Sequence, residues 1–246
     1  MIKRVAVLAA FAVVTTTACE SAPAKTAADA PPAVTTFGPA GWGKLTPGMT
    51  KDQALATGDL GADPVNVLGG CQDHSFADGP KPDPARMAAD AEVEQKYQDA
   101  VRKSDELDAA LGESPAAGAS ADEFATHAER AAAAAAASSD VATLAAESTD
   151  RIVARLEAST ASGGVSFGEG KLRLIGAPPA ARTAEDIGRG STEEQLKKAY
   201  EGKGLVNDGG RYSMPVTDHA GWKLGFDVTD GKVTYLLLLN LDVKCA

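Results

Sequence analysis

The chain has few aromatic residues, few cysteines and few histidines. Of its 246 residues only 5% are aromatic, and it has three cysteines and three histidines. Such a composition argues against a core rich in aromatic side chains, and the heavy use of alanine indicates lightly packed helix in part of the chain. The histidines and cysteines show no repeated metal-ligand spacing, so we predict no metal site and no cofactor.

Positive charge is also scarce. The chain has 24 lysine and arginine residues against 34 acidic residues, for a net charge of −10, and loss of a leader containing Lys3 and Arg4 lowers this to −12. Nucleic acid and anionic lipid both attract proteins through a positive field. The balance therefore argues against either as the main partner, and we interpret the acidity mainly as solubility.

The first 36 residues predict export. Residues 1–18 combine a basic start, an apolar run and small residues, which is the pattern of a signal peptide and too short to cross a bilayer. The stretch 16–19 resembles a bacterial lipobox, although Thr16 stands where an aliphatic residue is usual. We expect Cys19 to become the acylated first residue of the mature protein and to anchor it to the cell membrane; the alternative is cleavage nearby by an ordinary signal peptidase, with secretion. Residues 19–36 predict a disordered tether.

Two cysteines remain for the folded part. Cys71 and Cys245 are an even pair in a chain that we expect to be exported, so we predict a disulfide between them. No second cysteine lies two or three residues from either one, which disfavours a redox or metal role.

A hexapeptide with glycine first, threonine third, an acid fifth and glutamine last occurs twice, at 48–53 and, 142 positions later, at 190–195. Threonine followed three residues later by glutamine is a capping box, so each copy predicts the start of a helix. The cap residues are Thr50, Gln53, Thr192 and Gln195.

Between the two copies the composition changes. We predict a solvated polar loop over 72–84, which contains His74, and two helices over 85–161, broken near 112–119. The helices predict an antiparallel hairpin inserted into the rest of the fold. Its role is open between a partner-binding arm and a spacer, and its charge density excludes insertion into a membrane.

Segments 37–71 and 165–246 predict one α+β lobe. Residues 171–175 alternate as a strand does, and Asp230–Gly231 between two apolar runs predicts a β-hairpin. Leu236–Leu239 is apolar on both faces, so we place this strand in the sheet centre. Segment 37–71 has too few apolar groups for a domain, so we expect it to complete the sheet lobe. The fold class is α+β, an antiparallel sheet with short capping-box helices, plus the inserted hairpin.

The repeated Gly-x-Thr-x-x-Gln helix start resembles the repeat of small-lipoprotein A and β-lactamase-inhibitor-like proteins. The resemblance implies a short helical segment packed on an antiparallel sheet. Gly188–Ala199, the hairpin around Gly231 and the final Cys245 are also similar to a group of uncharacterised actinobacterial exported proteins. The resemblance covers 37–71 and 165–246, departs at the inserted hairpin, and implies almost nothing about activity.

Catalytic patterns are weak. His127 lies on a predicted helix, and His219 stands beside Asp218 in a turn, where an acid–base pair with Asp218 or Asp208 is the less favoured interpretation. We therefore predict no catalytic residues and a non-enzymatic, membrane-anchored extracytoplasmic lipoprotein that binds a protein or the cell envelope. The alternatives are an inhibitor of an exported hydrolase such as a β-lactamase, and a secreted hydrolase.

Overall fold

The structure, a computed structural model, describes residues 34–68 and 70–245. The predicted signal peptide, Cys19 and most of the predicted tether lie outside these residues. Strand β1 (Val34–Gly38) begins inside the last three residues of that tether and pairs with β2 (Gly41–Gly43). The tether prediction is therefore too long at its C-terminal end.

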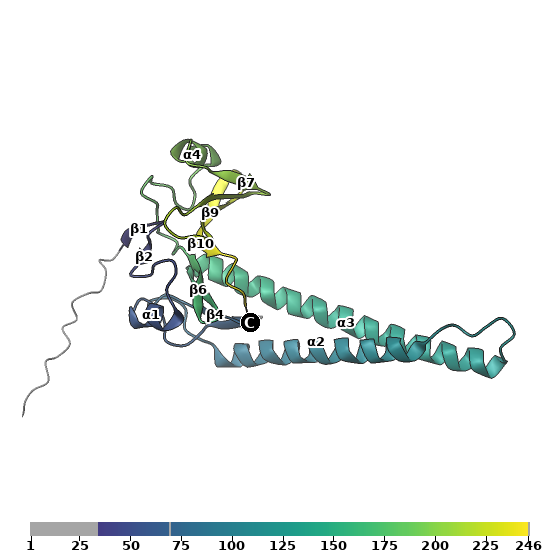
Figure 1. The fold of residues 1–246 in the computed structure, drawn as a ribbon. Coiled ribbons are helices and arrows are strands. Elements are labelled where there is room, and N and C mark those ends of the chain that lie inside the picture. The colour runs from purple at the N-terminus through teal and green to yellow at the C-terminus, as the bar shows by residue number, and fades with distance from the viewer. Residues whose placement is uncertain (1–33, 69, 246) are drawn as a thin grey trace, which may run out of the picture. The chain divides into compact units, whose positions relative to one another are not determined.

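The α+β fold class is confirmed. The described residues form four helices and an eight-stranded antiparallel sheet in the order β3-β4-β5-β6-β10-β9-β8-β7 (Figure 1). The remaining elements are α1 (Lys51–Ala56), β3 (Asn66–Leu68), β4 (Cys71–His74), α2 (Pro84–Leu111), α3 (Ala121–Ser162), β5 (Gly164–Gly168), β6 (Lys171–Gly176), α4 (Glu193–Ala199), β7 (Val206–Asp208), β8 (Arg211–Pro215), β9 (Trp222–Thr229) and β10 (Lys232–Asn240).

The lobe consists of two equivalent units. In each unit a short capped helix precedes a four-stranded meander, α1 before β3 to β6 and α4 before β7 to β10. The last strands of the two units, β6 and β10, pair with each other and join the meanders into one sheet. The units differ mainly between their second and third strands, where a short loop joins β8 to β9 and the pair α2 and α3 joins β4 to β5.

Both hexapeptides form reciprocal capping boxes. The Thr50 hydroxyl accepts from the Gln53 amide at 3.3 Å, and the Gln53 side chain accepts from the Thr50 amide at 2.9 Å. The corresponding distances for Thr192 and Gln195 are 3.2 and 2.8 Å. The two helices thus begin with the same local structure.

Each capped helix is hydrogen-bonded to the turn between the last two strands of its own unit. The Lys51 amide donates to the carbonyl of Gly170, and the Glu193 amide donates to that of Gly231, both at 2.9 Å. The two turns are Glu169–Gly170 and Asp230–Gly231, and all four of these residues have positive φ. The hexapeptides therefore bind equivalent turns, each formed by the last two strands of its unit.

One face of the sheet packs against α1 and α4 and forms the core. Leu236 and Leu238 of the central strand β10 point into it and are fully buried. The other fully buried large apolar side chains are Phe37, Leu45, Leu172, Ile175, Leu196, Leu224, Phe226 and Val233. Both units contribute to this set, which explains why segment 37–71 requires the rest of the chain.

The Cys71–Cys245 disulfide is present, with the two Cα atoms 4.6 Å apart. The segment before Cys245 runs across β5 and β6, where Arg173 Nε donates to the Val243 carbonyl at 3.0 Å. Gly168 leaves the space for this segment, because a Cβ built there would lie 2.1 Å from the Lys244 carbonyl oxygen. The disulfide thus connects the C-terminus to the first unit.

The predicted solvated loop 72–84 is wrong at its start. Strand β4 extends to His74, whose residue surface is only 1% exposed. His74 pairs in register with Val165 of β5, and its ring packs edge-on against Phe167 at 5.5 Å. Pairing with β5, a strand that lies beyond the helical insertion, buries a histidine whose local sequence is polar.

The helical pair follows the predicted insertion closely. Helix α3 continues without a break through Ser138–Asp140, and its 42 residues correspond to about 63 Å at 1.5 Å per residue. The residues buried between the helices are small or medium-sized: Val93, Ser104, Ala134 and Ala137. Among the helices of the described region, none is both long and apolar enough to cross a membrane.

Candidate functional site

The face of the sheet opposite α1 and α4 is the main candidate surface. Because Leu236 and Leu238 point into the core, the alternation along β10 places Tyr235, Leu237 and Leu239 on the opposite face. We call this side of the sheet the open face; Tyr235 and Leu237 lie buried at its centre, only 6% and 2% exposed.

A row of paired residues that includes the small residues Gly176, Gly225 and Ser213 crosses the open face; we call it the small-residue row. Leu237 stands opposite Gly176 on one side and Gly225 on the other, and the row continues through Ser213 to Val206. A Cβ built on Gly176 would lie 1.7 Å from the Tyr235 hydroxyl oxygen, so any larger residue there would force the Tyr235 side chain to move. Gly176, Leu237 and Gly225 are buried, whereas Val206 is 62% exposed, so the row is open to solvent at its β7 end.

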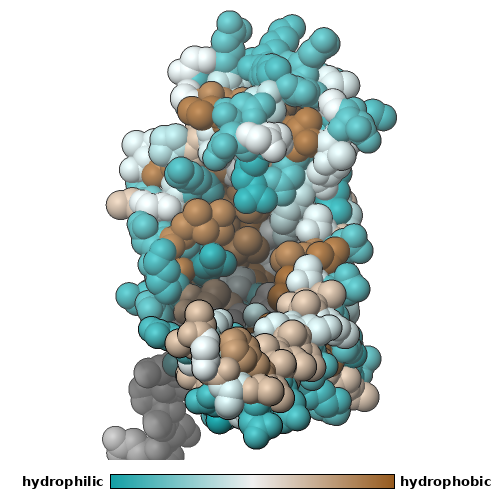
Figure 2. All heavy atoms as spheres, turned by 90° about the vertical axis from the view of Figure 1, so that its right-hand side faces the viewer, coloured by the Kyte–Doolittle hydropathy of each residue, from teal (hydrophilic) through white to brown (hydrophobic). Residues whose placement is uncertain are grey.

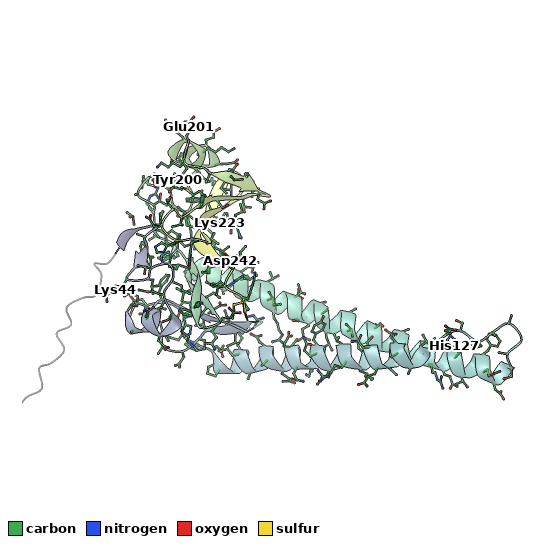
Figure 3. The ribbon with its side chains drawn as sticks, in the orientation of Figure 1. Lys44, His127, Tyr200, Glu201, Lys223 and Asp242 are labelled. Atoms are coloured by element: carbon green, nitrogen blue, oxygen red, sulfur yellow. A yellow bond between two sulfur atoms is a disulfide. The ribbon has the colours of Figure 1, made fainter. Side chains whose placement is uncertain are left out.

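Exposed apolar side chains lie at the borders of the open face. Six large apolar side chains of the described region are exposed, and four of them belong to α3, β7 or the residue after β10: Val153, Leu156, Val206 and Leu241, each 46% to 62% exposed. Figure 2 shows apolar atoms around a hollow between the helical pair and the upper strands. Lys223 and Asp242 lie on this side of the sheet, above α3 (Figure 3). The open face therefore combines apolar and charged groups.

A charged pair lies beside the small-residue row. Arg211 donates to Asp227 through Nε at 2.5 Å and Nη2 at 3.0 Å, a two-point contact that raises the pKa of Arg211. Burial, assisted by nearby carboxylates, raises the pKa of Tyr235 to about 12. Tyr235 thus keeps its proton at neutral pH and can donate a hydrogen bond, but it is poorly suited to act as a nucleophile or base.

Arg189, which directly precedes the second hexapeptide, connects the open face to the end of α3. Its guanidinium donates to the carbonyls of Thr160 and Ala161 in the last turn of α3 and stacks over Tyr235, 5.4 Å from the ring centroid. A cation at a helix C-terminus is favourable, and burial lowers the pKa of Arg189. This contact fixes the end of α3 beside the sheet.

A second polar cluster lies where α2 and α3 join the sheet. The Asp90 carboxylate accepts from Arg86 at 2.7 Å and from Arg151 at 3.1 Å, and Arg155 lies 3.4 Å away. Arg86 also donates to the Asn66 side chain of β3 at 2.9 Å. We call these three arginines and Asp90 the root cluster, because they connect both helices to each other and to the sheet edge.

The three histidines lie in separate environments. His74 Nδ1 is 2.9 Å from the Gly61 carbonyl and therefore carries the proton, and burial lowers the pKa of His74. His127 lies near the outer end of the helical pair (Figure 3). Among the hydrogen bonds between described residues, none joins the His219 ring to Asp218 or Asp208. The acid–base pair considered for His219 is thus not formed among the described residues.

Sequence reasoning identified the disulfide and both capping boxes but missed the open face and the root cluster. The open face depends on which strands pair, which short-range patterns do not contain. The root cluster had a local signal, since Arg86 and Asp90, and Arg151 and Arg155, are four residues apart on their helices. That their side chains converge is visible only once the hairpin is folded. Within the described region, no group of three or more histidine, cysteine or acidic residues is arranged to hold a metal ion.

Comparison with protein-family models, curated proteins and solved structures gives no match to this chain.

Proposed function

We propose that the protein is an exported, non-enzymatic binding module that is held at the cell membrane by lipid on Cys19. Its open face binds another protein or the cell-wall matrix. The observation that carries the proposal is the border of the open face, where four large apolar side chains are exposed around a buried centre. Apolar groups gathered on a surface beside charged ones are typical of interaction sites.

The binding role is tested by recovery of partners from intact cells. Val206→Asp and Leu156→Asp each place a charge among exposed apolar groups of the open face. Val67→Asp is the matched control, because Val67 is also a half-exposed valine but pairs in register with Gln72 at the other end of the sheet. Loss of the same cross-linked envelope partner with the first two variants and its retention with the control supports the proposal. Equal recovery with all three contradicts it.

The location is tested separately by mass spectrometry of the mature N-terminus. Export by a lipoprotein route predicts an acylated Cys19 as the first residue of the mature protein. Two or more acyl chains on Cys19 would anchor the protein stably to the membrane, since each buried methylene contributes about 0.8 kcal/mol. An unmodified N-terminus further along the chain contradicts the anchor.

The second candidate is an inhibitor of an exported hydrolase. We propose that the two units belong to the small-lipoprotein A and β-lactamase-inhibitor-like group; what supports this is that each hexapeptide opens a short helix followed by an antiparallel meander. Fold analogy is a weak argument for activity, so the test is direct. Inhibition of β-lactamases or muramidases by micromolar mature protein supports the inhibitor, and full enzyme activity at that concentration excludes it.

A further inference from the structure

The root cluster borders a cavity of about 350 Å³ between the sheet edge and the helical pair. Asn66, Asp90, Arg151 and Arg155 line this cavity and also a larger hollow of about 870 Å³ between α2 and α3. The smaller cavity has the size of a site for a small molecule. A small molecule in either cavity could therefore reach the root cluster, which also connects the helices to the sheet.

Within the root cluster, Arg155 is the guanidinium without a close carboxylate of its own, because Arg151 also pairs with Glu147 at 2.9 Å. The Asp90 side chain is only 10% exposed, and its two oxygens already accept from Arg86 and Arg151 at 2.7 and 3.1 Å. Arg155, which is 13% exposed, has only the long 3.4 Å contact to an Asp90 oxygen that Arg86 also uses. The Nε of Arg155 is buried and has no hydrogen-bond acceptor within the described residues.

The other charged groups at the cavity do not supply the missing acceptor. Asp83 accepts from the Arg86 amide at 3.0 Å as the N-cap of α2. Lys81 adds a further cation and donates to the Ala77 carbonyl at 2.7 Å. Asp73 is the remaining acid that lines the cavity, so four cations and three carboxylates line it, while Glu147 outside the lining pairs with Arg151.

A buried guanidinium without its own acceptor is costly, and a ligand that supplies oxygens removes that cost. The planar donor fork of arginine matches the paired oxygens of carboxylate and phosphate groups. We infer that this cavity binds a small ligand through its carboxylate or phosphate group, with Arg155 as the main contact and Arg151 as the second. This function is independent of the open face and of the proposed partner.

Binding is tested on the mature chain by isothermal titration with inorganic phosphate and with succinate, against sodium chloride at matched ionic strength. Saturable binding of one equivalent of either anion is expected, and the stronger of the two shows whether the group is a phosphate or a carboxylate. If neither anion gives heat beyond the chloride control, the site is refuted.

Variants show whether the anion binds at the root cluster. Arg155→Met is expected to weaken binding about tenfold to a hundredfold, the effect of one charge-assisted hydrogen bond. Arg155→Lys keeps the charge while losing the fork, so it weakens binding in a chain that retains its fold. Arg102→Met, at an exposed arginine further along α2, is the matched control and leaves the affinity unchanged.

The Asp90→Asn variant separates a ligand site from a purely structural cluster. Removing the carboxylate takes away a charge that repels the anion, so binding is expected to strengthen while the helical pair becomes less stable. Unchanged or weaker binding in a folded Asp90→Asn protein contradicts the site, as does equal affinity of the wild type and both Arg155 variants.

Discussion

Removing either helix cap should destabilise one shared lobe. Thr50→Ala and Thr192→Ala each delete a hydroxyl that accepts from a glutamine amide, at 3.3 and 3.2 Å. Loss of an N-cap typically costs about 1 kcal/mol. Because the two capping boxes have nearly the same geometry, we expect nearly equal losses, and about 2 kcal/mol for the double variant, since the caps do not touch each other.

Two tryptophans allow the two units to be followed separately. Trp222 is buried in β9 of the second unit, and Trp42 packs against the core from β2, ahead of the first hexapeptide. In urea unfolding, Trp42→Phe leaves a probe in the second unit, and Trp222→Phe leaves one near the first. Each cap variant should move both fluorescence transitions to lower urea by the same amount, because β6 and β10 join the units in one sheet.

Separate transitions would refute this reasoning. If Thr192→Ala moves only the Trp222 signal and Thr50→Ala only the Trp42 signal, the units fold as independent domains. A Thr→Ser change at each cap is the control, because serine retains the accepting hydroxyl and should stay close to the wild type.

Three further predictions concern stability. Replacing both Cys71 and Cys245 by alanine opens a loop of 174 residues, so the urea-unfolding free energy should fall by about 5 kcal/mol in the chain-entropy model, and a loss below about 1 kcal/mol would contradict a structural role. Burial lowers the pKa of His74, so the unfolded chain takes up a proton before the folded chain does as the pH falls below about 6.5. The free energy of urea unfolding should therefore fall by up to about 1.4 kcal/mol per pH unit below that pH. This loss should disappear in His74→Asn but persist in Leu196→Ala. Gly176→Ala should lower the free energy of thermal unfolding by about 1 to 3 kcal/mol, because the added Cβ clashes with the Tyr235 hydroxyl. Gly225→Ala should cost less, because its Cβ would contact the flexible Leu237 side chain at 3.1 Å. Equal losses in the two variants would contradict the packing described.

The sequence predicted the features that depend on neighbouring residues. Capping boxes, the Asp230–Gly231 turn and the amphipathic helices each arise from residues close together in the sequence. The disulfide was predicted from an even cysteine pair in a chain that we expected to be exported. The fold class followed from these elements together with the apolar run that forms β10.

The features that were missed depend on long-range pairing. His74 is in a polar stretch, yet β5, which lies beyond the whole helical insertion, covers it. Likewise, the row from Val206 to Gly176 exists only because five strands align in one register. Local sequence contains the side chains of such a surface but does not indicate which of them become neighbours.

The most direct test of the account is photo-cross-linking in intact cells from benzoylphenylalanine placed at Val206 on the open face or at Val67 outside it. Both positions are exposed valines, so the probes differ mainly in the surface that they sample. The account predicts a discrete adduct of higher mass from position 206 and none from position 67, with loss of the adduct when Leu156→Asp is added. Equal adducts from both positions, or none from position 206, would contradict binding through the open face.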